Sequence, residues 1–422
     1  MHPSRSANSM GHRKWMDEFR DRIRSMSAAA QQPVGAAEGK RPRDSYVEMF
    51  LRFGSDAAVL DEYINTYGSI RVGKVLEDLD ALAAAIAFLH VDAFTAAGGD
   101  ALTVVTASVD RIDMLRGIPT NMDVKMSGHI TYVGSSSIEI SIAVETCPQG
   151  APPPGSEGFG YEASFRNNHP SSETIITAKF IMVALDPKTG KPAKVHQLRL
   201  ETDEDNHNFL LGAEHKLSKK ESSEMALSKV PPKLDEMLLI HELHRENQRY
   251  QGPDGAVLKP KDVIWMKEAV QESLTICMPQ ERNLHHKIFG GYLMRLAFEL
   301  AYANALIFAE SPIVFVALDD ITFRQPVNIG SLLALRSQVV YAPGAPSMSF
   351  QVMVVADVIN PQSDGPKRQT TNTFHFTFAA PKLDRVPRVM PETYEESMNY
   401  IEGRRRKQRW VEHQTKVNRD LL

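Results

Sequence analysis

The sequence predicts an α+β protein made of two similar halves, each a curved antiparallel sheet wrapped around one long central helix. Three observations predict this: an internal repeat, strands with a two-residue period, and a long apolar helix ahead of each set of strands. The repeat aligns SVDRIDMLRGIP at 108–119 with ALDDITFRQPVN at 317–328, an offset of 209 residues. The same offset brings Tyr132 onto Tyr341, so the register continues into the next strand.

The first half is expected over residues 44–215. Its central helix is predicted at 71–90, where apolar residues recur at helical spacing. Alternation of apolar and polar residues predicts strands at 122–132 and 138–144, and a last strand is predicted at 175–185. Between the last two strands, Pro and Gly residues crowd residues 148–172, which predicts a long inserted loop.

The second half is expected over residues 263–390, with its helix at 290–309. Strands are predicted at 333–341, 350–354 and 370–378. In the last of these strands, three phenylalanines alternate with outward-facing threonines, which indicates that one face of the strand is buried.

Three further segments complete the organisation. Residues 1–43 are expected to be a leader outside the core, with a short helical stretch from Trp15 to Met26. The leader carries no acid before Asp17, and it fits either an organelle transit peptide or a disordered tail. Residues 216–262 are expected to connect the halves, and residues 391–422 to form a basic helical tail whose RRRKQR cluster is a solvated face.

Composition excludes several classes of protein. The 422 residues carry a net charge of −4 with 42% hydrophobic residues, as in ordinary globular proteins, and unlike a global nucleic-acid binder or a disordered chain. The longest apolar run, Ala81 to Leu89, has nine residues, about half of what crosses a bilayer, so no stable membrane insertion is expected. The two cysteines, Cys147 and Cys277, have no metal-site spacing, which indicates a reducing compartment and no metal.

A family likeness is carried by the two strand motifs of the repeat together with three other segments. These are MPQERN at 278–283, NLHHKIFGGYLMR at 283–295 and GKVLEDLDALAAAIA at 73–87. Over about residues 45–395 the chain resembles the acyl-CoA thioesterases with tandem (double) hotdog domains, most of all their mitochondrial type 9 branch. The resemblance implies an enzyme that hydrolyses fatty acyl-CoA to a free fatty acid and coenzyme A. It implies no cofactor besides the coenzyme A of the substrate, a mitochondrial matrix location rather than a cytoplasmic one, and a homo-oligomer such as a trimer of double hotdogs.

Two features of the residues fit thioester hydrolysis. Gly290 and Gly291 open the second helix, where unpaired backbone N–H groups and the helix dipole can stabilise a carbonyl oxygen that gains negative charge. Asp80 lies in the apolar stripe of the first helix, and burying a carboxylate there without a function is costly. We expect Asp80 to activate water, and its neighbours Glu77 and Asp78 to form a solvated acidic edge.

The two helices differ where this chemistry is expected. Aligning Gly73 with Gly291 places Asp80 over Phe298, so the second helix lacks the acid, and Glu299 lies one position beyond it. In the related family, the loop before the helix of one domain faces the helix of the other domain. The resemblance therefore implies one composite site, made of Asp80 and the 283–291 loop.

The loop departs from the family pattern at one position. Where an asparagine often stands three residues before the glycine pair, this chain has Lys287. We expect the role of the missing asparagine to pass to Asn283 or His285, or Lys287 itself to contact the carbonyl or a phosphate. For coenzyme A, Lys287, Arg116 and Arg324 are candidate phosphate ligands, and Phe289 and Gly290 complete the expected binding residues.

Two other functions share these features. Hotdog folds also include hydratases and dehydratases, which need an acid–base pair that here would involve the histidines of the 283–291 loop. A non-catalytic acyl-CoA-binding protein is the second alternative, suggested by Lys287. A thioesterase releases free thiol from acyl-CoA, whereas a hydratase or dehydratase and a binding protein do not, so thiol release distinguishes the three functions.

Overall fold

The computed structural model describes residues 39–91, 102–153, 160, 171–250, 258–283, 286–361 and 367–420. The predicted Trp15–Met26 helix therefore lies outside the described residues. The chain forms two compact units, and segments of the second half of the sequence belong to the first unit. The first unit holds Met1–Lys216, Ile276–Leu296 and Asp320–Ser331, and the second unit holds Leu217–Thr275, Ala297–Asp319 and Leu332–Leu422.

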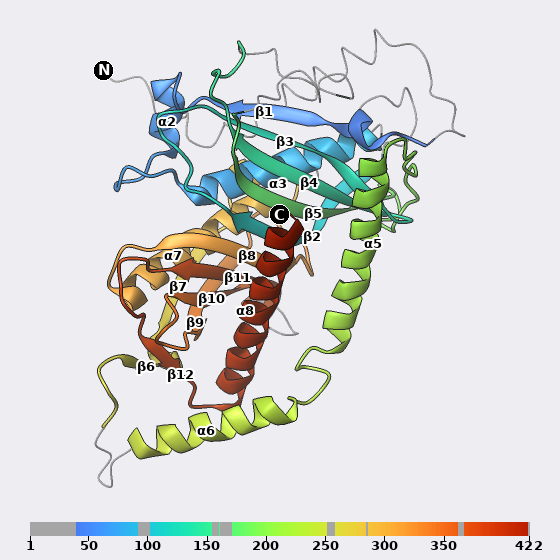
Figure 1. The fold of residues 1–422 in the computed structure, drawn as a ribbon. Helices are drawn as coiled ribbons and strands as arrows, with labels where there is room; N and C mark the ends of the chain where they lie inside the picture. Colours follow the sequence, from blue (N-terminus) through green and yellow to red (C-terminus); the bar gives the residue numbers. More distant parts are fainter. Residues whose placement is uncertain are drawn as a thin grey trace, which may run out of the picture. The chain divides into compact units, whose positions relative to one another are not determined.

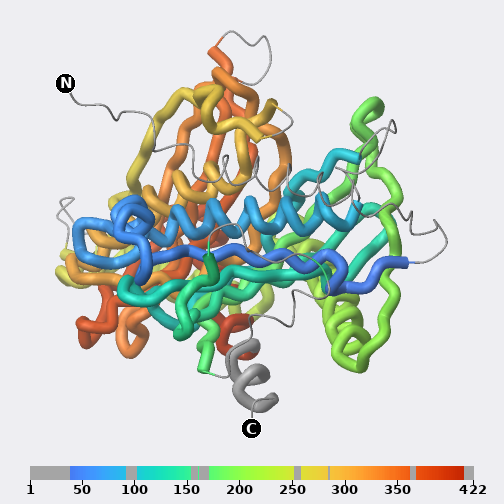
Figure 2. Tube along the Cα trace, turned by 90° about the horizontal axis from the view of Figure 1, so that it is seen from above, coloured from blue at the N-terminus to red at the C-terminus, as the bar shows by residue number. Residues whose placement is uncertain are grey.

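The first unit contains a five-stranded run of antiparallel strands in the order β1-β3-β4-β5-β2. The strands span β1 Val47–Leu51, β2 Thr103–Met114, β3 Val124–Val133, β4 Ser137–Thr146 and β5 Thr174–Leu185. The helix α3, Val72–His90, packs against all five (Figure 1), and the view from above shows it lying along one face of these strands (Figure 2).

The helix α3 is buried on almost every side. Leu76, Leu79, Leu82 and Ile86 are fully buried, and the small Ala residues between them let the sheet approach closely. This burial leaves the three acids of the helix inside the protein.

The second unit repeats the arrangement, with strands in the order β8-β11-β10-β9-β7. They span β7 Val270–Ile276, β8 Val314–Thr322, β9 Leu332–Tyr341, β10 Ser349–Ile359 and β11 Arg368–Ala379, and the central helix α7 spans Gly290–Ala309. As predicted, Phe374, Phe376 and Phe378 of β11 are fully buried, and Phe298 of α7 packs edge-on against Phe315 and Phe376.

The segments outside the two sheets are largely helical. Helix α5, Asp203–Glu224, begins within the expected first half and ends in the expected connector, which also contains α6, Leu234–Tyr250. The basic tail is α8, Tyr394–Asp420. Short elements complete the order: η1 Pro42–Ser45, α2 Ala57–Tyr63, η2 Met266–Glu268, η3 Pro279–Glu281, and the parallel pair β6 Val263–Trp265 and β12 Arg388–Met390. The predicted inserted loop at 148–172 falls between β4 and β5, and most of it lies outside the described residues.

One described helix, α7, is apolar and long enough to cross a bilayer by length and composition, and 56% of that window is buried in the fold. Cys147 and Cys277 are both free and buried. The aligned repeat residues Asp110 and Asp319 lie inside β2 and β8, which begin at Thr103 and Val314.

Candidate active site

The first unit brings Asp80 of α3 into contact with the start of α7. The Gly291 backbone N–H donates to Asp80 Oδ2 over 2.6 Å, and the Thr106 hydroxyl of β2 donates to Asp80 Oδ1 over 2.9 Å. Asp80 is fully buried. Both carboxylate oxygens are thus fixed by neutral donors, one at the end of a helix.

The burial of Asp80 changes its acidity. Loss of hydration raises the pKa of Asp80 to about 6, although the hydrogen bonds from Thr106 and Gly291 act in the opposite direction. No charged group contributes to this shift. A carboxylate with a pKa of about 6 is ionised at pH 7 and is more basic than an exposed aspartate.

The two glycines are required by close packing. A Cβ on Gly291 would lie 2.9 Å from the Glu77 backbone and 2.7 Å from the Phe289 ring, and a Cβ on Gly290 would lie 3.0 Å from Asp80 Oδ2. Glycine therefore lets the start of α7 touch α3 and the carboxylate.

The sequence suggests that the backbone N–H groups of both glycines are unpaired, but only one of them is. The Gly291 N–H is used by Asp80. Within the described part of the chain, the Gly290 N–H has no acceptor in hydrogen-bonding range. Gly290 is therefore the amide of the pair that is available for a carbonyl oxygen.

The expected solvated acidic edge is wrong. Glu77 and Asp78 are both buried, because partners distant in sequence enclose them. The Arg295 guanidinium of α7 lies 3.2 Å from Glu77 Oε2, and the Tyr63 hydroxyl donates to Asp78 Oδ2 over 2.7 Å. Burial raises the pKa of Glu77 to about 7 and that of Asp78 to about 6.

The loop before α7 is organised by Asn283. Its backbone N–H donates to the Lys287 carbonyl, and its Oδ1 accepts the Lys287 N–H over 3.1 Å. The Lys287 side chain is exposed and its Nζ donates to Asn328 Oδ1 over 2.7 Å. His286 adopts a positive φ of 56° and is exposed, and His285 lies outside the described residues.

The remaining expected binding residues differ in their surroundings. Phe289 is half-buried, and its ring lies against the start of α7. Arg324 is exposed and follows Phe323, whose ring lies 3.3 Å from the Cβ position of Gly290. Arg116 is exposed and forms an ion pair of 3.0 Å with Glu173.

Residues that the sequence analysis did not single out complete the site. Thr106 is a threonine in a β-strand, where threonine is common, so only its contact with Asp80 identifies it. Arg295 lies one turn into α7, and its pairing with Glu77 has no sequence signal either. Glu299 of α7 is exposed. The described residues contain no group of three His, Cys, Asp or Glu side chains that could hold a metal ion.

The fold defines this chain as a tandem hotdog protein, because each unit holds a long helix against an antiparallel sheet and the sequence repeats between them. Known proteins of similar sequence agree. The bovine "Acyl-coenzyme A thioesterase 9, mitochondrial" is 36% identical over 406 residues, covering 95% of this chain and 85% of that protein. The human protein of the same name is also 36% identical, over 95% of this chain and 84% of its own length.

This chain belongs to the acyl-CoA thioesterase family, and within it to the relatives of thioesterase 9, so it is a hydrolase. No family model matches the sequence. Among solved structures, an acyl-CoA hydrolase from Staphylococcus aureus bound to butyryl coenzyme A and coenzyme A aligns with a TM-score of 0.34 and 26% identity, covering 38% of this chain and 99% of that one. An acyl-CoA hydrolase from Bacillus cereus aligns with a TM-score of 0.32 and 19% identity, covering 46% of this chain and 100% of that one.

Proposed function

We propose that this protein hydrolyses fatty acyl-CoA to a free fatty acid and coenzyme A, with Asp80 as the general base that activates water. The observation that carries the proposal is the buried Asp80 carboxylate fixed by Gly291 and Thr106 at the start of α7. A base held rigidly where a helix begins lies next to the amides and dipole that favour a negatively charged oxygen.

The reaction needs a second group that stabilises the oxyanion. The Gly290 N–H at the start of α7 is the donor proposed for the thioester carbonyl oxygen, reinforced by the helix dipole. Water then attacks the carbonyl carbon while Asp80 takes its proton. Collapse of the tetrahedral intermediate breaks the carbon–sulfur bond, and the proton held by Asp80 passes to the leaving thiolate, which restores the base.

Substrate binding is proposed to use the surroundings of α7. Lys287 and Arg324 are exposed cations from the two segments that flank the glycines, and they would contact coenzyme A phosphates. Arg116 is the weaker candidate, since Glu173 already neutralises it. Asn283 organises the loop through Lys287, so its proposed role is positioning. Phe289 would pack against the acyl group next to Gly290.

The relatives support two further parts of the proposal. Their names place them in mitochondria, which supports a mitochondrial location for this chain. Within the mitochondrion, the matrix is the compartment that we propose. Self-association into a homo-oligomer, such as a trimer, is supported by the edge strand β7, where Leu274 and Ile276 are 60% and 51% exposed. Light scattering on the purified protein tests this, and a monomer at micromolar concentration would rule it out.

The test of the activity is thiol release from an acyl-CoA series of increasing chain length. Asp80→Asn, which keeps the size of the side chain, should lose at least ~100-fold in kcat, in line with the loss of a general base. Asp78→Asn is the matched control, because Asp78 lies on the same helix turn and is also buried, yet it bonds Tyr63. Equal turnover by wild type and Asp80→Asn, with both folded, would contradict the proposal.

A further inference from the structure

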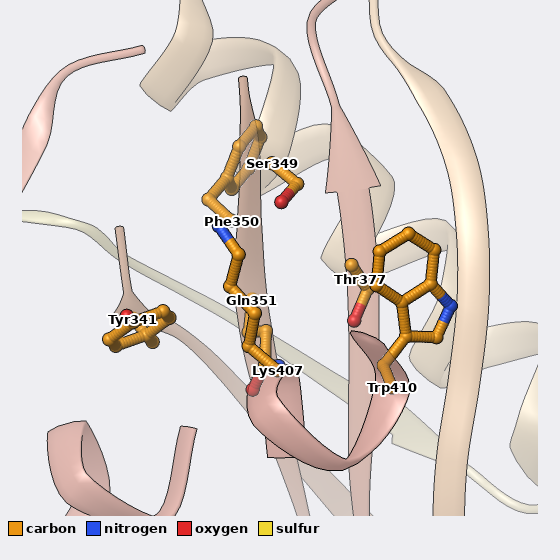
Figure 3. A pocket seen from close by; sticks show the side chains of 7 residues that line it. All are labelled: Tyr341, Ser349, Phe350, Gln351, Thr377, Lys407 and Trp410. Carbon is orange, nitrogen blue, oxygen red and sulfur yellow. The ribbon is translucent and has the colours of Figure 1, made fainter. Parts of the chain in front are cut away.

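A small cavity lies in the second unit between α8 and the strands β9, β10 and β11 (Figure 3). Gln351 and Thr377 line it from the strands, and Lys407 and Trp410 line it from the helix. Its volume of about 10 Å³ is enough for about one water molecule, which is too little for a substrate or a coenzyme. The surroundings of Gly290 in the first unit, next to the proposed base, bear more directly on function.

The space beside Gly290 is bounded by the proposed base and by an aromatic ring. A Cβ on Gly290 would lie 3.0 Å from Asp80 Oδ2, and 3.3 Å and 3.4 Å from Cε1 and Cζ of Phe323. The carboxylate oxygen and the edge of the ring therefore face the same point, next to the amide that is proposed to bind the carbonyl oxygen. Gly290 and Phe323 are both half-buried, so this side of Asp80 borders solvent.

Backbone pairing holds Phe323 in this place, one residue past the end of β8. Its N–H donates to the Ala107 carbonyl over 3.0 Å, and the neighbour of Ala107 is Thr106, whose hydroxyl bonds Asp80. Side chains alternate along a strand, so Phe323 shares the face of Ile321, which is fully buried. The pairing of these two strands thus places both the Thr106 donor and the Phe323 ring beside Asp80.

The acidity of Asp80 depends on how well water is excluded from it. Loss of hydration is the largest cause of its raised pKa of about 6, and its hydrogen bonds act in the opposite direction. Charged side chains of the surrounding elements bond elsewhere: Glu77 of α3 with Arg295 of α7, Asp78 of α3 with Tyr63, and Arg111 of β2 with Asp113. None of them contributes to the shift of the Asp80 pKa.

The groups that meet Asp80 have opposite effects on it. Thr106 and Gly291 donate hydrogen bonds, which favour the ionised carboxylate. The Phe323 ring has no hydrogen-bond donor, so its effect is to take the place of water. A carboxylate that is shielded from water is a stronger base, and a stronger base removes a proton from the attacking water more readily.

We infer that Phe323 is a positioning residue of the hydrolysis, whose ring shields the Asp80 carboxylate from bulk water on the side of Gly290. The inference rests on the proposed function, because Phe323 acts through the proposed base. It assigns the two strands distinct tasks: β2 supplies the hydroxyl that holds Asp80, and the residue after β8 supplies the apolar ring that keeps it dry.

The internal repeat suggests which substitutions are informative. The offset of 209 residues aligns Phe323 with Met114, at the end of β2, so a methionine is compatible with this position of the motif. Methionine is flexible and apolar, whereas glutamine has a similar length and carries a polar amide. The pair Phe323→Met and Phe323→Gln therefore separates the exclusion of water from the shape of the side chain.

The test follows kcat/KM for thiol release against pH, because this quantity reports the ionisation of the free enzyme. Phe323→Ala and Phe323→Gln let water or a polar group reach Asp80, so the midpoint near pH 6 should move downward by about one unit. Phe323→Met should keep the wild-type midpoint. Phe209→Ala is the matched control, since Phe209 is a half-buried residue of α5 that packs on Tyr132, and it should also keep the midpoint.

Urea unfolding gives a second readout that does not depend on activity. The pKa of Asp80 in the folded protein lies above its ordinary value of 3.8, so Asp80 makes the protein less stable as pH rises from 4 to 7. The difference in this slope between wild type and Asp80→Asn measures the effect. In the Phe323→Ala background, the same difference should be roughly half as large.

The outcomes distinguish this inference from the proposed function. If Asp80→Asn abolishes turnover but Phe323→Ala and Phe323→Gln change neither the midpoint nor the stability difference, the hydrolysis stands and the inference is overturned. If the midpoint moves equally in Phe323→Gln and Phe323→Met, exclusion of water is not the cause, which also overturns it. If wild type shows no turnover that depends on Asp80, the proposed function fails, and the stability difference still decides whether Phe323 shields Asp80. If Phe323→Ala does not fold, Phe323→Gln and Phe323→Met decide.

Discussion

The Gly291 N–H and the Asp80 carboxylate are 2.6 Å apart, although the two residues are separated by 211 positions in the chain. This hydrogen bond joins the helix of the first half of the sequence to the start of the helix of the second half, inside one compact unit. It fixes the carboxylate beside Gly290, whose N–H has no acceptor among the described residues. The proposed base and the proposed oxyanion donor are therefore held together by the backbone.

The acidity of Asp80 predicts the pH dependence of the reaction. Burial raises its pKa to about 6, and a general base acts only when it is ionised. We expect kcat to rise about tenfold per pH unit below pH 6 and to level off above it. Initial rates of thiol release between pH 4.5 and 8.5 measure this, and a flat profile across pH 6 would argue against Asp80 as the base.

Gly291→Ala is expected to disturb both stability and activity. The new methyl group would meet the Glu77 backbone and the Phe289 ring at less than 3.0 Å, and backbone cannot move aside cheaply. Overpacking of this kind costs about 1–3 kcal/mol, and the shift of α7 should also release Asp80. Urea unfolding and thiol release measure the two effects. Gly117→Ala is the control, because its Cβ would meet nothing within 4 Å; equal behaviour of the two variants would contradict the packing argument.

Thr106 is expected to act as a positioning residue for Asp80. Its hydroxyl stabilises the ionised carboxylate, so Thr106→Val should move the pH midpoint of kcat upward by up to about one unit and lower kcat at pH 7. Thr106→Ser keeps the hydroxyl and should restore the midpoint. A valine variant with lower kcat but an unmoved midpoint would show that the hydrogen bond does not tune the base.

Glu77 is expected to make stability depend on pH. Its pKa of about 7 in the folded protein lies above the ordinary value of 4.5, so its contribution is fully present at low pH and is lost as pH rises through 7. Between pH 5 and 8 this amounts to at most about 3 kcal/mol, since one pKa unit corresponds to about 1.4 kcal/mol.

Glu77→Gln should remove that part of the slope, because glutamine does not titrate. The measurement is urea unfolding at pH 5 and pH 8. Glu299→Gln serves as the control, since Glu299 is exposed, and it should keep the wild-type slope. A Glu77→Gln protein with the same slope as wild type would show that Glu77 is ionised at little cost through the Arg295 pair.

Periodicity in the sequence was sufficient to predict the repeat, both central helices and most of the strands, because each sheet buries one face and each helix is apolar on most sides. The burial of Asp80 could be predicted for the same reason, since it lies in an apolar stripe. The surroundings of the three acids of this helix could not be predicted from periodicity. Glu77 and Asp78 look like a solvated edge until Arg295 and Tyr63, which local sequence does not connect with them, are placed beside them.

The use of the glycine amides could not be predicted either. Two glycines at a helix start suggest two free donors, and only the fold shows that one of them bonds Asp80. Likewise, the basic RRRKQR segment looks uniformly solvated, but Arg404 and Arg405 pair with α6 and Arg406 with α8 itself. Among the described residues, Lys407 has no acidic partner. Such distinctions depend on which helices pack together.

A single turnover in H₂¹⁸O, with enzyme in excess over acyl-CoA, tests the central claim most directly. If Asp80 activates water, the fatty acid released in the first turnover carries one ¹⁸O and the Asp80 side chain carries none. If Asp80 attacked the thioester itself and water then opened the resulting anhydride at the Asp80 carboxyl carbon, the first fatty acid would keep an oxygen of the carboxylate, and mass spectrometry would find ¹⁸O on the peptide that contains Asp80. The account predicts labelled acid and an unlabelled peptide; the opposite distribution would contradict it.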